Sequence, residues 1–89
     1  MTATENVQEF KGESWTACST FIRSIRAAAW KEGKLRDMAW MAELASVYMA
    51  DKALVWHSRL PDDVQEDWSK LQAAMIDHWS LWGDQVKEE

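Results

Sequence analysis

The sequence predicts an all-α fold, a compact bundle of four to five short helices. Apolar residues recur at spacings of three and four along most of the chain, which is the repeat of an amphipathic helix. No run alternates apolar and polar residues between turn signals, as paired strands would. With 89 residues, 47% hydrophobic and 28% charged, the chain has the size and composition of one globular domain.

The first helix is expected to begin after Ser14, a favourable N-cap residue. Residues 1–9 are interpreted as a flexible, polar leader that lacks the apolar core of a signal peptide. We expect Phe10 to lie on the domain in an extended segment that Gly12 ends. Gly33 is the natural C-terminal residue of the helix. The apolar stripe of this helix is Trp15, Cys18, Ile22, Ile25 and Ala29.

Residues 36–60 are helical by periodicity, as one long helix or as two. No glycine or proline interrupts them, so periodicity alone leaves both alternatives open. Asp51 is the best candidate for a break, because aspartate caps helix N-termini well. Pro61 ends the segment, because proline disfavours helical dihedrals at the preceding residue. The expected stripes are Met38, Met41, Ala45 and Tyr48, and then Ala53, Trp56 and Leu60.

The last helix is expected to be capped by Asp67 and to end at Gly83. Its stripe is Trp68, Leu71, Met75, Trp79 and Trp82. The helical domain is therefore predicted over residues 10–83, with a charged tail at 84–89. The predicted structural core is Trp15, Ile22, Ile25, Ala53, Trp56, Leu60, Trp68, Leu71, Met75 and Trp79.

The sequence contains no motif that indicates catalysis, a metal site or a cofactor. Its two histidines have no HExxH or Cys/His spacing. Cys18 is the only cysteine, which excludes an intramolecular disulfide and a cysteine zinc site, and favours a reducing, cytoplasmic setting. No apolar run approaches the roughly 20 residues of a membrane helix. We therefore expect a protein that is not an enzyme and has no cofactor, metal or membrane partner.

Charge is distributed unevenly. The net charge of −5 argues against a nucleic acid as direct partner. Five basic residues nevertheless occur between positions 23 and 36 with a single acid, Glu32, and acidic residues predominate after position 61. The basic region is either a solvated helix face or an interface for an acidic partner. Trp30 and Trp40 fit the helical stripes poorly and are candidates for a contact surface.

Four motifs follow one another along the chain: Phe10-Lys11-Gly12, Phe21-Ile22, Met49-x-Asp51-x-Ala53-x-x-Trp56-x-x-x-Leu60 and Trp68-x-x-Leu71-x-x-x-Met75-x-x-x-Trp79. Together they resemble the retrotransposon Gag domain of the gypsy type, the N-terminal lobe of its capsid protein. The neuronal Arc protein has a similar capsid-like lobe. Two positions depart from the family pattern: Asp51 stands where the family has glycine, and Trp79 where it has phenylalanine.

The resemblance implies a capsid-like fold and a non-enzymatic function, self-assembly into rings or shells, in a retrotransposon or a host-adopted Gag protein. Its partner would be a second copy of itself. A ring needs a contact in which two different surfaces meet, and oppositely charged regions provide them. The predicted self-association interface is Arg23, Arg26, Arg36, Asp62, Asp63, Glu66 and Asp67.

The likeness to the Arc lobe implies an alternative function, a monomeric module that binds short linear peptides. The expected groove lies next to the N-terminal segment and is lined by Phe10, Trp30 and Trp40. A mass that rises with concentration favours assembly, and a strict monomer with an exposed apolar groove favours peptide binding. A helical scaffold without assembly history is the third possibility.

Overall fold

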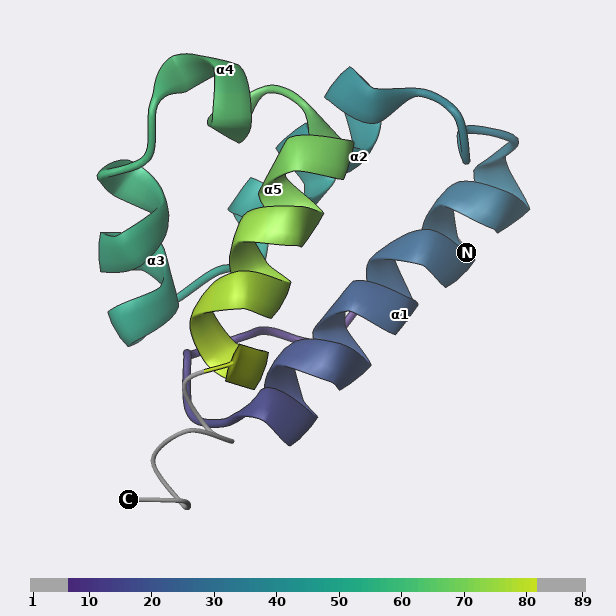
Figure 1. Ribbon diagram of the computed structural model, residues 1–89. Coiled ribbons are helices and arrows are strands. Elements are labelled where there is room, and N and C mark those ends of the chain that lie inside the picture. Colours follow the sequence, from purple (N-terminus) through teal and green to yellow (C-terminus); the bar gives the residue numbers. More distant parts are fainter. Residues whose placement is uncertain (1–6, 82–89) are drawn as a thin grey trace.

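The computed structural model describes residues 7–81, which fold as helices joined by short turns (Figure 1). Helix α5 continues directly into a π-helical turn, η2, and packs on α2 and α4, while η2 and α2 both pack on α1. The all-α prediction is confirmed for these residues, in which strand pairing is limited to one isolated bridge, Phe10 with Met49. The elements are α1 (Trp15–Glu32), α2 (Met38–Val47), α3 (Asp51–Ser58), α4 (Asp62–Gln65), α5 (Trp68–Met75) and η2 (Ile76–Leu81).

Helix α1 has the predicted ends. The Ser14 hydroxyl accepts a hydrogen bond from the Ala17 amide at 3.1 Å, which satisfies one of the unpaired N–H groups of the first turn. Gly33 adopts the left-handed conformation with φ 70°, and the next amide, of Lys34, donates to the Ala29 carbonyl at 2.7 Å. The buried side of the helix consists of Cys18, Phe21, Ile22, Ile25, Ala28 and Ala29.

The segment 36–60 forms two helices, and the N-terminal segment stabilises the break between them. The Phe10 amide donates to the Tyr48 carbonyl, and the Ala50 amide donates to the Phe10 carbonyl, both at 2.9 Å. Backbone groups that a continuous helix would pair internally are therefore paired with residue 10. The prediction that the Asp51 side chain caps the second of these helices is wrong: Ala50 is the N-cap and has no side-chain bond.

Asp51 instead adopts a left-handed backbone conformation, with φ 51°. Glycine reaches this region without the roughly 1–2 kcal/mol that it costs an L-residue with a Cβ. We therefore expect Asp51→Gly to be more stable than Asp51→Ala by about 1 kcal/mol in urea unfolding, although alanine is the better residue in ordinary helical positions. Both substitutions remove the carboxylate, so charge cancels in the comparison. A more stable alanine variant would contradict the prediction.

Asp67 caps α5, as predicted, and the helix then widens. The Asp67 carboxylate accepts hydrogen bonds from the Ser69 amide at 2.9 Å and the Ser69 hydroxyl at 2.7 Å. These bonds, led by that of the hydroxyl, hold the pKa of Asp67 below its usual value. From Ile76 the chain follows a π-helical turn, which the apolar spacing did not indicate. The predicted positions Trp82 and Gly83 and the tail at 84–89 lie outside the described residues.

The core confirms most of the predicted positions and corrects one. Trp15 was predicted to be buried but is 39% exposed; it is the first residue of α1, and the buried side of the helix begins at Cys18. Trp56, Leu60 and Trp79 are partly buried and pack against the core. Val7, in the predicted leader, is buried as well. The predicted positions that are buried are Ile22, Ile25, Ala53, Trp68, Leu71 and Met75.

Cys18 lies on the buried side of α1, with none of its surface exposed. Burial raises the pKa of its thiol to about 12. Because the thiolate is the reactive form, the folded protein should react with Ellman's reagent only through opening of the core, far more slowly than the same chain in urea. The absorbance of the reagent's product, followed over time for the folded protein and for the chain in urea, measures the two reaction rates. Equal rates would show that the thiol is accessible in the folded state.

None of the helices within residues 7–81 combines the length and the apolar character that crossing a lipid bilayer requires.

Candidate interaction surfaces

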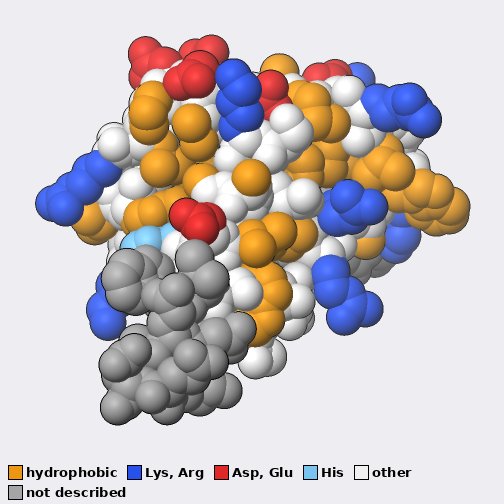
Figure 2. Space-filling view, in the orientation of Figure 1, with side chains coloured by type: hydrophobic (Ala, Val, Ile, Leu, Met, Phe, Trp, Pro, Cys, Tyr) orange, Lys and Arg blue, Asp and Glu red, His pale blue; other side chains and the backbone are white. Residues whose placement is uncertain are grey.

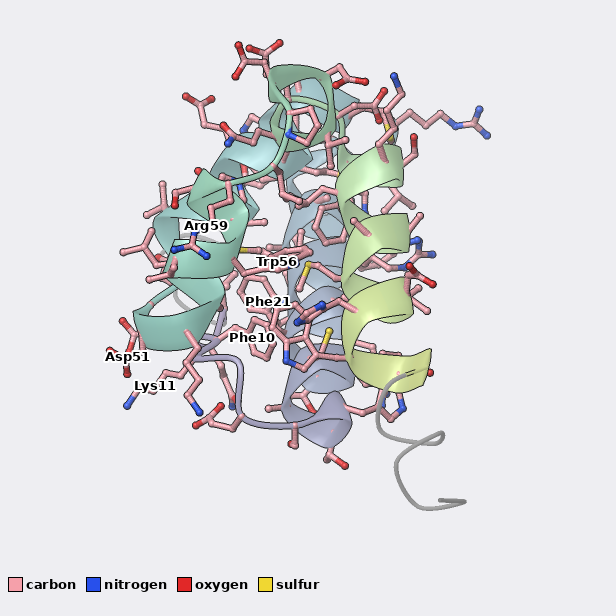
Figure 3. The ribbon with its side chains drawn as sticks, turned by 60° about the vertical axis from the view of Figure 1, so that its left-hand side comes forward. Phe10, Lys11, Phe21, Asp51, Trp56 and Arg59 are labelled. Carbon is pink, nitrogen blue, oxygen red and sulfur yellow. The ribbon has the colours of Figure 1, made fainter. Side chains whose placement is uncertain are left out.

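An aromatic cluster joins the N-terminal segment to the end of the fold. The Phe10 ring stacks on Phe21 with centroids 5.4 Å apart and meets Trp79 edge-on at 4.9 Å. Trp79 in turn contacts Trp56 at 4.8 Å and His78 at 4.5 Å. Phe10, Phe21 and Trp56 lie in the interior in Figure 3, whereas Asp51 and Arg59 point away from α3. This cluster fixes the position of α3 and of the segment beside it.

The outer side of α3 carries a groove of about 690 Å³. Val55 is 50% exposed in it, and Trp56 connects it to the aromatic cluster. Gly12 lies against the same helix, since a Cβ on Gly12 would be 3.2 Å from the Lys52 Cβ. The groove is therefore next to the N-terminal segment. Its lining residues are Asp51, Lys52, Val55, Trp56, Arg59 and Leu60.

The three residues predicted for a peptide groove are not brought together there. Phe10 is 1% exposed and belongs to the core, which corrects its predicted place in an open groove. Trp30 lies nine residues beyond Phe21 on α1, a separation of roughly 13 Å along the helix. Trp40 is partly buried in the first turn of α2. The observed groove is built from α3 instead, which sequence reasoning missed because exposed Val55 does not belong to an apolar stripe.

A basic face covers the exposed side of α1. Arg23, Arg26 and Trp30 follow at spacings of three and four and are all exposed, with Lys31 and Lys34 beside them. We call these five residues the basic face. Trp30 is 71% exposed, although tryptophan is large and apolar. Within the described residues, the salt bridge that is formed involves none of these cations. Arg36 is exposed in the turn that follows α1.

An acid turn lies on a different side of the molecule. It consists of Asp62, Asp63 and Glu66, which are exposed on and after α4. Figure 2 shows acidic side chains gathered over α4 and basic side chains over α1. Helix α4 packs on α5 and α2, whereas α1 packs on α2 and η2. Asp63 forms a salt bridge with Lys70 at 3.4 Å, and both side chains are more than half exposed, so the pair contributes little to stability.

A second cavity, of about 360 Å³, lies where α2, α3 and α4 meet, and we call it the α2–α4 pocket. His57 is 9% exposed in it, and its Nε2 is buried without a hydrogen-bond partner. Burial lowers the pKa of this imidazole, which favours its neutral form. The lining residues are Ala39, Glu43, Ser46, His57, Gln65 and Glu66.

The predicted interface residues are thus divided between four places, one of which is the turn after α1 that holds Arg36. Arg23 and Arg26 are on the basic face, and Asp62, Asp63 and Glu66 form the acid turn, where Glu66 also lines the α2–α4 pocket. Asp67 is occupied in capping α5. No group of three or more His, Cys, Asp and Glu side chains within residues 7–81 is arranged to hold a metal ion.

No protein-family model, curated protein or solved structure matches the chain.

Proposed function

We propose that this chain is a non-enzymatic interaction domain that associates with copies of itself, as the resemblance to Gag capsid lobes implies. The observation that carries the proposal is the basic face on one side of the fold and the acid turn on another. Because the two surfaces are apart in one molecule, they can meet only between molecules. A head-to-tail contact of this kind closes into a ring or continues as an open assembly.

Besides its positive charge, the basic face contains residue types that contribute most of the binding energy at protein interfaces. Trp30 projects from its centre, and tryptophan and arginine are the residues that dominate binding energy at protein interfaces. Long-range attraction between the basic face and the acid turn would steer the encounter, and a buried indole would contribute most of the affinity. Screening by salt should therefore weaken the association without abolishing it.

Two backbone features support the likeness to the Gag pattern. Asp51 has the positive φ that suits glycine, the residue that the family has at this position. Gly12, the glycine of the Phe10-Lys11-Gly12 motif, has φ 81° and lies against the start of α3. The motif positions thus coincide with backbone geometry that favours those residue types. The single cysteine supports an intracellular setting, which we include in the proposal.

The test is sedimentation equilibrium of the chain, with concentrations up to about 1 mM to reach weak contacts. The mean mass should rise above 10.3 kDa with concentration. Arg23→Glu with Arg26→Glu should weaken association at least about tenfold, whereas Lys11→Glu with Lys52→Glu, exposed and equal in charge change, should leave it within about threefold. Mixing the first variant with Asp62→Lys, Asp63→Lys should restore association. A wild-type mass that stays at the monomer value would overturn the proposal.

The α3 groove favours the second candidate function, peptide binding by a monomer. It adjoins the N-terminal segment, and its exposed Val55 and partly buried Trp56 offer an apolar floor between Lys52 and Arg59. A monomeric chain whose amide resonances in α3 shift on addition of acidic, apolar peptides would support this function. Replacing Val55 with lysine should remove these shifts, and the same replacement of Val47, which is 69% exposed on α2, should not.

A further inference from the structure

We propose that the α2–α4 pocket receives an arginine side chain from the basic face of a second copy. This inference rests on the proposed self-association and names one contact of it. The pocket is formed by three helices and has a volume at the lower end of the range for ligand sites, about 300–1,000 Å³. It suits one side-chain head group better than a larger ligand.

The pocket presents hydrogen-bond acceptors and no cation. Glu43 and Glu66 supply carboxylates, and none of the lining residues is lysine or arginine. The amide nitrogen of Gln65 is already used, since it donates to the His57 and Leu60 carbonyls, each at 3.0 Å. The Ser46 hydroxyl likewise donates to the Glu43 carbonyl at 2.7 Å, which leaves its oxygen to accept. A chemical group that only donates hydrogen bonds would therefore complement the lining of this pocket.

His57 supplies the observation that points to a missing partner. Its Nε2 is enclosed by the protein and forms no hydrogen bond in the described structure, and buried polar atoms are ordinarily paired. A neutral imidazole accepts a hydrogen bond at Nε2 when its proton is on Nδ1. Because Nε2 itself has less than 1 Å² of exposed surface, a donor that enters between Glu43 and Glu66 would pair with it once the imidazole ring turns toward the pocket.

Guanidinium matches this arrangement better than ammonium. It carries five N–H donors and no acceptor, and it binds carboxylates through two parallel hydrogen bonds. It is also less strongly hydrated than the lysine ammonium, which lowers the cost of entering a partly enclosed site. Among the cations of the basic face, Arg23 and Arg26 carry this group, and both are exposed on α1, which does not line the pocket.

The experiment compares two neutralising pairs that change the charge equally. Glu43→Gln with Glu66→Gln removes the carboxylates of the pocket, and Glu9→Gln with Glu13→Gln removes two exposed carboxylates that belong neither to the pocket nor to the acid turn. By sedimentation equilibrium, the first pair should weaken self-association at least about tenfold and the second no more than about threefold. Arg23→Lys with Arg26→Lys should also weaken it, although charge is retained. Thermal unfolding confirms that each variant is folded.

A double-mutant cycle and a small probe distinguish the possible failures. Combining the glutamine pair with the lysine pair should cost much less than the sum of the two effects, because both remove one contact. Nα-acetyl-arginine amide should shift the His57 resonances of the wild-type protein and not those of the glutamine pair. If the wild type associates and the glutamine pair associates equally well, the pocket assignment is wrong while self-association stands. If the wild type is monomeric, the proposed function fails and this contact with it, whatever the probe does.

Discussion

Replacing Phe10 with alanine should lower the free energy of unfolding by about 3–5 kcal/mol, the usual cost of truncating a buried phenylalanine. Phe10 is 1% exposed, stacks on Phe21 and meets the edge of Trp79. A domain of this size has a total stability of roughly 5–15 kcal/mol. One substitution in the N-terminal segment should therefore remove a large part of it, although the segment contains no helix.

Urea unfolding followed by tryptophan fluorescence measures this effect. Phe10→Leu is the matched control, since it keeps an apolar side chain of similar size and should cost less than about 1.5 kcal/mol. Val47→Ala, at a side chain that is 69% exposed, should change the free energy by no more than about 0.5 kcal/mol. A cost below about 1 kcal/mol for Phe10→Ala would mean that the core folds without the N-terminal segment, contrary to its packing.

The sequence predicted features that depend on neighbouring residues. Ser14 and Asp67 cap their helices and Gly33 ends α1 because each acts within one turn of the chain. The apolar stripes also identified most of the core, because burial follows the helical repeat. Trp15 shows the limit of that rule: it continues the repeat of α1, but the buried side of the helix begins only at Cys18.

Features that depend on distant residues could not be predicted in the same way. The break at residues 48–50 is stabilised by backbone hydrogen bonds to Phe10, thirty-eight residues or more earlier in the chain, and no local signal encodes that pairing. The π-helical turn and the left-handed conformation of Asp51 were likewise not indicated by the apolar spacing. A local reading assigned Asp51 to capping, the commonest role of aspartate in such a position.

The candidate sites likewise include features that neighbouring residues predict and features that only the fold brings together. The basic face and the acid turn were visible as runs of charge in the sequence, because helical spacing alone gathers them. The α2–α4 pocket combines residues 39 to 66 from three helices, so its carboxylates and His57 become neighbours only in the fold. For the two histidines the sequence showed only the lack of metal-site spacing, and the buried, unpaired nitrogen of His57 becomes visible only in the fold.

Replacing Gly12 with alanine should destabilise the fold by about 2–5 kcal/mol, and the reason is a close approach as well as a backbone conformation. Gly12 has φ 81°, where a residue with a Cβ is strained by roughly 1–2 kcal/mol. A Cβ would also lie 3.0 Å from the Ala53 amide nitrogen and 3.3 Å from the Trp79 ring. Crowding of this kind in a packed region costs about 1–3 kcal/mol more.

A substitution at Gly33 measures the backbone strain without the crowding. Gly33 has a similar conformation, φ 70°, but no atom lies within 4 Å of the place its Cβ would occupy. Gly33→Ala should therefore cost only the strain, about 1–2 kcal/mol. The difference between the two variants in urea unfolding measures the crowding between the N-terminal segment and α3. Equal costs would show that the segment can move away from α3 freely, and a groove that depends on their contact would then have no fixed shape.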